Sequence, residues 1–285
     1  MSEAIIDLAH LQGWQGRSET VTDQITAQLL RGFRAVLDID PGTPVAGEIV
    51  PQALHWCLSP PTVPMHEIGP DGHPARGGFL PPVPLPRRMW AGGRLTFHDA
   101  LRVGDAIERI STVEKVTMKE GRTGLLCFVL VSHRLSTERG VAIEEEHDIV
   151  YRGLDAPAVG ARPMADGMGR IDASQEIEPS PVLLFRYSAL TFNGHRIHYD
   201  RDYVTKVEGY PGLIVHGPLQ ATMLMQLAAR MNGETPVRTF SFKAVSPLFD
   251  TTRFSLNGRM DDSYAASLWV AGAGGALHME AKAGW

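Results

Sequence analysis

Apolar positions follow two different periods along the chain, and the clearest helical period lies in its last third. From residue 218 to 231, leucine and methionine recur at spacings of three and four residues, and alanine fills much of the remaining face. A helix that is apolar over most of its circumference belongs inside a fold. Gly217 fits the N-cap and Pro218 the first helical position, where a missing N–H costs nothing. We therefore predict a buried helix over residues 217–231.

Residues 88–151 follow a strand pattern instead. β-branched and aromatic residues dominate four runs, which are separated by turn sequences such as Val103-Gly104-Asp105. This pattern is typical of an antiparallel meander, and it returns after the predicted helix. The predicted strands cover residues 89–97, 106–119, 124–137, 141–151, 237–245, 252–260, 264–271 and 276–283.

Two other stretches precede these strands. Residues 18–38 are predicted as an amphipathic helix, because Val21, Ile25, Leu29 and Phe33 recur every fourth residue. Residues 60–86 hold many prolines and glycines, which indicates an extended segment that lies over a surface or a cleft.

Both halves of the chain can be written as a helix followed by antiparallel strands, which predicts a repeated α+β unit. We place an N-terminal unit at residues 1–151 and a C-terminal unit at residues 182–285. The intervening residues 152–181 are rich in glycine, proline and alanine, and we predict that they form a linker.

Composition narrows the class of protein. A net charge of −5 gives no electrostatic footprint for nucleic acid. Cys57 and Cys127 lie in apolar surroundings without metal-ligand spacing, which favours reduced, buried thiols, a cytoplasmic location and no metal site. Residues 1–10 lack a basic region and a long apolar run, and no stretch reaches membrane-spanning length, so we expect no membrane partner.

A loop dense in histidine and amide groups lies shortly before the predicted buried helix, at residues 193–200. The backbone N–H groups at the start of a helix have no partner within it, and the macrodipole favours negative charge there. A carbonyl oxygen that gains charge during a reaction would be well placed at Gly217.

The run YSALTFNGHRIHYD at residues 187–200, with EGYPGLIVHGPL at 208–219, resembles the MaoC-like hydratase and dehydratase family. It is most similar to the branch of mesaconyl-C4-CoA and itaconyl-CoA hydratases and mitochondrial-type 3-hydroxyacyl-thioester dehydratases. Residues 85–93 and 101–105 fit the same family. The resemblance implies a double hot dog fold, in which two antiparallel sheets each wrap a long central helix and the thioester enters between the two units.

The resemblance also implies reversible addition of water across the C2=C3 bond of an acyl thioester, with CoA as part of the substrate and no other cofactor. In many family members an aspartate and a histidine five residues later hold the water, and the matching positions here are Asn193 and His198. An amide cannot take a proton at neutral pH, so His198 must carry most of the acid–base work. The Gly217 N–H is the predicted donor to the enolate oxygen.

Five further residues are candidates for substrate binding. Arg88 and Trp90 follow the proline-rich segment and could line the acyl or pantetheine channel, although strand packing explains Trp90 equally well. Arg196 could meet a phosphate or a substrate carboxylate, and a solvated surface arginine is the ordinary alternative. The other two are Gly194, in the histidine loop, and His216, which we expect to fix the turn before the helix.

We predict a hydratase of a short branched dicarboxylic acyl-CoA, either itaconyl-CoA or mesaconyl-C4-CoA, that forms citramalyl-CoA. The free carboxylate of such a substrate needs a cationic partner, for which Arg88, Arg196 and Arg238 are candidates. Three alternatives stay open: a 3-hydroxyacyl-ACP or -CoA dehydratase, a thioesterase, and a non-catalytic acyl-thioester-binding protein. Assembly as a homodimer also stays open.

Overall fold

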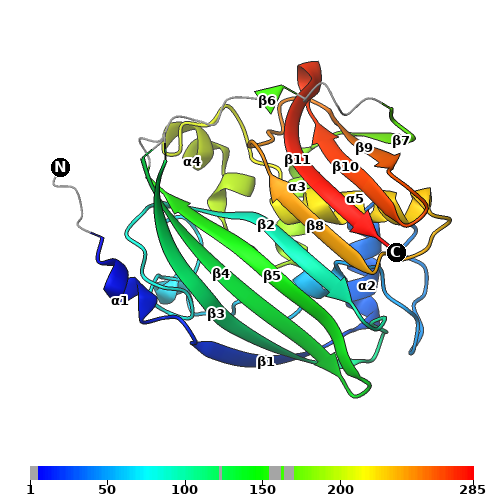
Figure 1. Cartoon of the computed structure of the whole chain (residues 1–285), viewed down its shortest axis with the longest axis horizontal. Helices are drawn as coiled ribbons and strands as arrows, with labels where there is room; N and C mark the ends of the chain where they lie inside the picture. The colour runs from blue at the N-terminus through cyan, green and yellow to red at the C-terminus, as the bar shows by residue number, and fades with distance from the viewer. Residues whose placement is uncertain (1–5, 122–123, 154–161, 164–169) are drawn as a thin grey trace.

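The structure, a computed structural model, describes residues 6–121, 124–153, 162–163 and 170–285. Within these residues, eleven strands form one antiparallel sheet in the order β1-β3-β4-β5-β2-β8-β11-β10-β9-β7, and β6 pairs with β11 (Figure 1). The strands are β1 (Ser18–Gln24), β2 (Arg87–Phe97), β3 (Ala106–Gly121), β4 (Gly124–Thr137), β5 (Gly140–Arg152), β6 (Arg162–Pro163), β7 (Ala173–Ile177), β8 (Thr239–Ala244), β9 (Phe254–Met260), β10 (Ala265–Ala271) and β11 (Ala276–Gly284).

The predicted strands are confirmed, because each of the eight runs coincides with one of β2 to β5 or β8 to β11 within a few residues. Their β-branched and aromatic residues pack on a sheet with one face against the core. The α+β class is confirmed as well.

The sheets of the two halves join edge to edge where β2 pairs with β8, with Gly92 opposite Lys243. A Cβ on Gly92 would come 2.6 Å from the carbonyl oxygen of Phe242, and one on Gly93 would come 2.9 Å from Cε1 of the Phe242 ring. Glycine therefore allows the two backbones to approach at this seam. The sheet of the first half continues into that of the second, and both halves face the same core.

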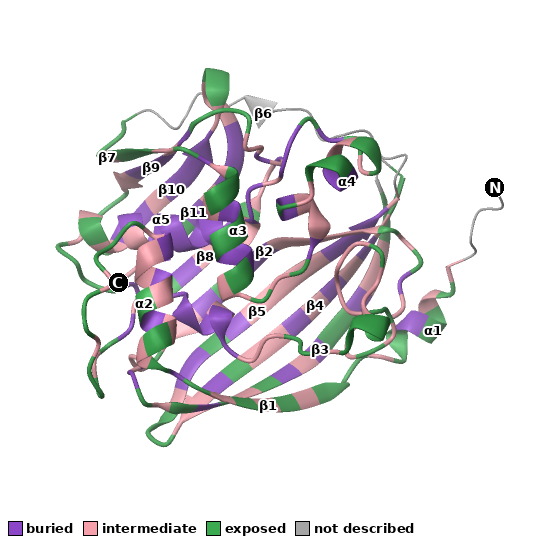
Figure 2. Cartoon of the chain, turned by 180° about the vertical axis from the view of Figure 1, so that it is seen from behind, coloured by how far each residue is buried: buried purple, intermediate pink, exposed green. Residues whose placement is uncertain are grey.

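Helices lie on one face of this sheet (Figure 2). Helix α5 contacts β8 to β11, and its buried residues belong to a core cluster that also includes residues of α2 and of the strands of the first half. The buried central helix predicted at residues 217–231 is thus confirmed. The helices are α1 (Leu8–Gln12), α2 (Ala27–Val36), α3 (Pro181–Leu190), α4 (Arg201–Lys206) and α5 (Gly217–Met231), with short 3-10 turns η1 (Leu54–Cys57), η2 (Met65–Glu67), η3 (Arg196–His198) and η4 (Ala273–Gly275).

The single helix predicted over residues 18–38 is wrong in its first part. Strand β1 occupies residues 18–24 and pairs with β3, and helix α2 begins only after Thr26, whose hydroxyl accepts the Leu29 N–H. A spacing of four residues is a multiple of two and also lies close to 3.6, so Val21 and Ile25 fit a strand as well as a helix. The N-cap threonine marks the boundary that the periodicity misses.

The proline-rich segment at residues 60–86 is irregular except for η2, and its last part packs on β3 to β5 in the first half. Val83 at its end is fully buried in a cluster with Leu11 of α1 and Val113, Val129 and Tyr151 of β3 to β5. The extended segment predicted over a cleft is confirmed, because many of its residues line the cavity described below.

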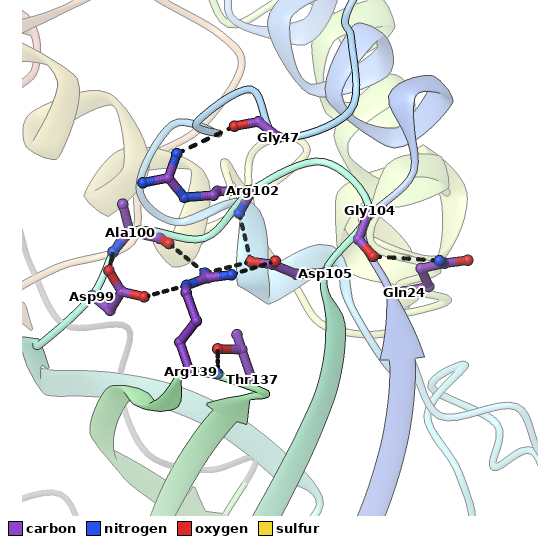
Figure 3. Close-up of polar contacts among 9 residues, drawn as sticks. All are labelled: Gln24, Gly47, Asp99, Ala100, Arg102, Gly104, Asp105, Thr137 and Arg139. Atoms are coloured by element: carbon purple, nitrogen blue, oxygen red, sulfur yellow. Dashed lines mark hydrogen bonds and ion pairs between the residues drawn. The ribbon is translucent and has the colours of Figure 1, made fainter.

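Arg139, in the turn between β4 and β5, ties this end of the sheet to the loop before β3 (Figure 3). Its guanidinium donates to Asp99 Oδ2 at 2.7 Å, to both carboxylate oxygens of Asp105 at 2.8 Å, and to the carbonyl oxygen of Ala100 at 3.0 Å. The hydrogen bonds from Arg139 hold the pKa of Asp105 below its ordinary value. Such a forked pair fixes orientation as well as charge.

The predicted linker at residues 152–181 is described only in part, because residues 154–161 and 164–169 lie outside the described residues. The described part contributes β6 and β7, which pair with β11 and β9 of the second half. The boundaries at residues 151 and 182 stay predictions.

Cys57 and Cys127 are free and buried, as predicted. Burial raises the pKa of the Cys57 thiol to about 12 and that of Cys127 to about 11, so both stay protonated at neutral pH. Over the described ranges, no helix combines the length and the apolar character needed to cross a membrane.

Candidate active site

A cavity of about 1340 Å³ receives side chains from both halves of the chain. The first half contributes Arg88 and Trp90 from β2 and His73 from the proline-rich segment. The second half contributes the histidine loop, including His198, and Gly217 at the start of α5. The cavity therefore brings together residues that lie more than a hundred positions apart in the sequence.

His198 presents a neutral imidazole with a free Nε2 to this cavity. Its Nδ1 lies 2.7 Å from the carbonyl oxygen of Ile214. Because a carbonyl can only accept, Nδ1 carries the proton and Nε2 keeps its lone pair. The ring is only slightly exposed, and burial lowers the pKa of His198 to about 4. At neutral pH the ring is therefore neutral, and its Nε2 lone pair can accept a hydrogen bond or a proton.

His216 holds the ring of His198 from behind. The two imidazoles stack with centroids 3.7 Å apart and an angle of 18° between their planes. The Nε2 of His216 lies 2.8 Å from the hydroxyl oxygen of Ser188, on α3. Burial, followed by the charge of His198, keeps the pKa of His216 well below its ordinary value. The structure thus places His216 next to the predicted base, in a position that orients it.

Gly217 is the first residue of helix α5 and His216 is its N-cap, so the assignment of Gly217 as the N-cap is wrong by one residue. Within the described part of the chain, no side chain caps this end and no acceptor binds the Gly217 N–H. A Cβ at Gly217 would have one neighbour within 4 Å, the carbonyl oxygen of Trp90 at 3.7 Å. The N–H therefore remains available to an oxygen in the cavity, at the positive end of the helix dipole.

Asn193 is engaged in the loop itself. Its side-chain oxygen accepts the His195 N–H at 3.0 Å, and its own N–H donates to the carbonyl oxygen of Ser188 at 2.8 Å. This arrangement is an Asx turn, which shapes the chain before η3. The Asn193 oxygen that could hold a water therefore already accepts one backbone hydrogen bond, and the turn fixes its direction.

The predicted binding arginines lie in different surroundings. Arg88 and Trp90 line the cavity, whereas Arg196 binds Asp200 at 2.8 Å and the carbonyl oxygen of Pro70 at 3.0 Å. The guanidinium of Arg196 also lies over the ring of Tyr203, 4.2 Å from its centroid. Arg196 thus links two loops and is not among the residues that line the cavity.

The indole N–H of Trp90 donates to the carbonyl oxygen of Gly92 at 2.8 Å, and its ring packs against His147 and Trp56. Gly194 lies at the cavity wall, where its carbonyl oxygen accepts the Tyr199 hydroxyl at 3.0 Å. Arg238, another candidate from sequence, is exposed and does not line the cavity.

Sequence reasoning did not single out Asp71 and His73, which the proline-rich segment carries into the site. The Nδ1 of His73 lies 3.0 Å from Asp71 Oδ2, and the ring of His73 lies 4.1 Å from that of His195, centroid to centroid. The ring of His195 lies 5.4 Å from that of His198. Asp-Gly-His in a glycine-rich loop has no periodicity, so only the spacing of a carboxylate two residues before a histidine could have drawn attention to it.

Asp71, His73 and His195 offer ligand atoms that all lie within 4.8 Å of one another, a donor set that could hold a metal ion. Nitrogen and carboxylate ligands of this kind suit several divalent metals. The Asp71–His73 hydrogen bond, however, already places a ring proton between two of the three donors. Asp71 and His73 therefore form a hydrogen-bonded pair as they stand, and they could bind a metal through this nitrogen only after its proton is lost.

A second polar network, which the sequence analysis also missed, lies deeper in the first half. Glu145 is buried and accepts the Trp56 indole N–H at 2.8 Å, and its oxygens lie 3.1 Å from His55 Nε2 and 2.6 Å from His147 Nε2. Burial alone would raise the pKa of Glu145, but His147 and His55 outweigh burial and hold it well below its ordinary value. His133 continues the chain of hydrogen bonds from His147. The network supports the cavity wall beneath Trp90.

Comparison with known proteins agrees with this geometry. The model of the hydroxyacyl-thioester dehydratase type 2 family matches residues 53–250, which include both the proline-rich segment and the histidine loop. The chain belongs to this family. It is also 44% identical over 251 residues to mesaconyl-C(4)-CoA hydratase of Chloroflexus aurantiacus, which covers 88% of this chain and 89% of that relative. A member of this family is an enzyme of the hydro-lyase type, as the sequence predicts.

Solved structures confirm the double hot dog fold. A MaoC-like dehydratase of Phytophthora capsici superposes with a TM-score of 0.72 at 13% identity and covers 98% of each chain. A double hot dog protein of Mycobacterium tuberculosis has a TM-score of 0.53 at 14% identity, covering 95% of this chain and 96% of that one. At such low identity these likenesses concern the fold alone.

Proposed function

We propose that the enzyme adds water reversibly to mesaconyl-C4-CoA and forms citramalyl-CoA. The observation that carries this proposal is the 44% identity to the Chloroflexus mesaconyl-C(4)-CoA hydratase, which extends over nearly nine tenths of both chains. The cavity supports it, because a neutral imidazole and a free helix N-terminus face the same space. Itaconyl-CoA, a dicarboxylic thioester that can give the same product, is the second substrate to test.

The proposed reaction uses His198 as the base. Its Nε2 takes a proton from water as the water oxygen bonds to the β-carbon. The electron pair of the double bond moves toward the thioester, whose oxygen gains charge and accepts the Gly217 N–H. The protonated His198 then delivers its proton to the α-carbon, so that one water has been added and the base is restored.

A dicarboxylic substrate also needs a cation near its β-carbon, and we assign that role to Arg88. The positive charge of Arg88 lies close enough to lower the pKa of His73 and of His195, in addition to the larger effect of burial on both. In the described residues no carboxylate forms an ion pair with Arg88, whereas Arg87 beside it is paired with Glu208. Arg88 can therefore donate hydrogen bonds to a carboxylate of the substrate.

The test is to incubate the purified protein separately with mesaconyl-C4-CoA, itaconyl-CoA and crotonyl-CoA and to follow the mass gain of one water. Hydration of a dicarboxylic thioester with little hydration of crotonyl-CoA supports the proposal. Hydration of crotonyl-CoA alone contradicts it, because that substrate has no second carboxylate.

A second candidate function rests on the family match itself. The matched family is that of hydroxyacyl-thioester dehydratases, and the cavity is large enough for an acyl chain. A dehydratase would use the same base and the same helix N-terminus in the reverse direction. Assays with 3-hydroxyacyl thioesters of increasing chain length separate the two functions, because only the dehydratase should prefer long unbranched chains.

Arg88→Met is expected to lower kcat/KM for mesaconyl-C4-CoA about ten- to a hundredfold, since a hydrogen bond to a charged group is worth about 1.5–3 kcal/mol. Its kcat/KM for crotonyl-CoA should change little, because that substrate has no carboxylate to pair. Arg238→Met, which removes an exposed arginine away from the cavity, is the matched control. An equal loss with both substrates would assign Arg88 to some other part of the thioester.

Gly217→Ala tests the oxyanion position. A methyl group there contacts the protein only at an ordinary distance, so the melting temperature should stay unchanged. The same methyl group displaces the thioester carbonyl from the N–H, and a displacement of about 1 Å can lower the rate about a hundredfold. Steady-state kcat is the measurement, and Gly153→Ala, where a Cβ meets nothing within 4 Å, is the control. A fully active Gly217→Ala enzyme would remove this N–H from the mechanism.

A further inference from the structure

His73 enters the site from the first half of the chain, and the reaction described above does not use it. The loop that carries it is docked firmly on the histidine loop of the second half. The backbone N–H of Arg196 donates to the carbonyl oxygen of Asp71 at 2.9 Å, and the Arg196 side chain donates to the carbonyl oxygen of Pro70. A Cβ on Gly72 would come 1.8 Å from the carbonyl oxygen of Gly194, so the two backbones touch directly. The position of His73 relative to His198 is therefore built into the fold.

The orientation of the His73 ring is fixed in the same way as that of His198. The Asp71 carboxylate accepts the His73 Nδ1–H, so the neutral His73 ring has its lone pair at Nε2. Both histidines line the same cavity, and the ring of His195 is in contact with both of their rings. Two imidazoles whose Nδ1 atoms are hydrogen-bonded, and whose Nε2 atoms keep a lone pair, thus line one cavity.

A water that attacks a β-carbon is best oriented when both of its hydrogens are held, because its lone pair then points at the carbon. His198 can accept one hydrogen. The side-chain oxygen of Asn193 already accepts the His195 N–H, so it has only its second lone pair for the other hydrogen, in a direction that the Asx turn fixes. Among the described residues that line the cavity, His73 offers an acceptor for that hydrogen, because Asp71 accepts its Nδ1–H and Nε2 keeps a lone pair.

We propose that His73, with Asp71 behind it, is a second catalytic residue, whose Nε2 accepts a hydrogen bond from the water that His198 deprotonates. This role rests on the hydratase or dehydratase function proposed above. One O–H of the water breaks and its proton passes to His198, while the other O–H stays intact, hydrogen-bonded to His73. The new C–O bond uses a lone pair of the water oxygen, and the proton on His198 then goes to the α-carbon. In dehydration, the same two imidazoles receive the leaving water.

The charges around His73 suit an acceptor. Burial is the main cause that lowers the pKa of His73 to about 4, and the charges of Arg88 and Arg76 act in the same direction. Asp71 opposes them, and it remains ionised because its pKa lies at about 2: hydrogen bonds and charge from His73, with the charge of Arg88, outweigh burial. His73 is thus a neutral acceptor at pH 7, and the Asp71 carboxylate strengthens its hydrogen bond to the water.

The experiment compares His73→Ala, His73→Gln and Asp71→Asn with the wild-type enzyme on mesaconyl-C4-CoA and on a 3-hydroxyacyl thioester. We expect His73→Ala to lower kcat about a hundredfold while KM changes little. Added imidazole should restore part of that kcat, because it can occupy the space left by the ring. The Gln variant should keep part of the activity, since its amide oxygen can still accept, and Asp71→Asn should lower kcat about tenfold.

His66→Ala is the matched control, because His66 lies on the same segment and its side chain is 80% exposed. It should keep wild-type kcat and show no response to imidazole. A His73→Ala enzyme with wild-type kcat would overturn the proposal, and so would a loss of kcat that imidazole does not restore. If the wild-type enzyme itself turns over none of the thioesters, the proposed function fails first, and the role of His73 fails with it.

Discussion

His198→Ala is expected to lower kcat about 10²- to 10⁴-fold while the thioester still binds, because general acid–base catalysis by a positioned side chain is worth about that much. The reason lies in the geometry of one ring. The His198 Nδ1–H donates to the carbonyl oxygen of Ile214, so the neutral ring is held in the tautomer that leaves the lone pair on Nε2. Single-turnover kinetics together with calorimetric binding of the thioester separate the lost chemistry from retained binding.

The ring of His198 is stacked on His216, so its removal also leaves a void. His198→Gln fills much of that space without a base, and it should be as inactive as the alanine variant while melting closer to wild type. His98→Ala removes a partly exposed histidine that is paired with Glu144 at the surface, and it should keep full activity. Turnover by His198→Gln at the wild-type rate would take His198 out of the mechanism.

Acid should destabilise the folded protein steeply between about pH 6.5 and pH 4. Burial lowers the pKa of His73 and His198 to about 4, and it lowers those of His133, His195 and His216 as well. Below pH 6.5 the unfolded chain binds protons at these positions and the folded chain does not, so stability falls as pH falls. Each such histidine contributes about 1.4 kcal/mol per pH unit, and together they remove several kcal/mol from a typical total of about 5–15 kcal/mol.

Urea denaturation at pH 7.5, 6.5 and 5.5 measures this fall in the free energy of unfolding. His133→Gln should flatten the dependence by about one proton, because it removes one buried group that titrates only in the unfolded chain. His66→Gln, which changes a histidine that is 80% exposed, is the control for the substitution itself. A free energy of unfolding that stays constant from pH 7.5 to 5.5 would show that these imidazoles titrate normally in the folded state.

The strands and the buried helix could be predicted because each repeats its pattern over many residues. The eight strand runs and residues 217–231 are long enough for one period to dominate. The prediction of one helix over residues 18–38 failed for the opposite reason, because β1 and α2 are both short and their apolar residues share a spacing of four. Helix α4 was missed because its six residues are too few to show a period, and Asp200 caps it within the histidine loop. The pairing of β2 with β8 lies beyond local pattern, because its partners are more than 140 residues apart.

Some residues of the candidate site could be predicted from the sequence and others could not. His198, His216 and Gly217 lie within twenty residues of one another, so a single stretch of sequence carries them. His73 lies over a hundred residues away, in a loop without periodicity, and its neighbourhood depends on how two units dock. The partner of Arg196 could not be predicted either, because an arginine in the histidine loop can bind a substrate as well as a carbonyl oxygen such as that of Pro70. The roles of these residues in catalysis stay predictions until the variants are measured.

The contact between Gly72 and Gly194 restricts which residues two distant loops can carry. Each would place a Cβ within 2.6 Å of the carbonyl oxygen of the other, so neither position can gain a side chain while the other loop stays in place. A side chain at either position would therefore require the other loop to move. Exchange of residues 69–76 or 193–200 with those of a relative should preserve this contact only when the incoming loop also carries glycine at the contact position.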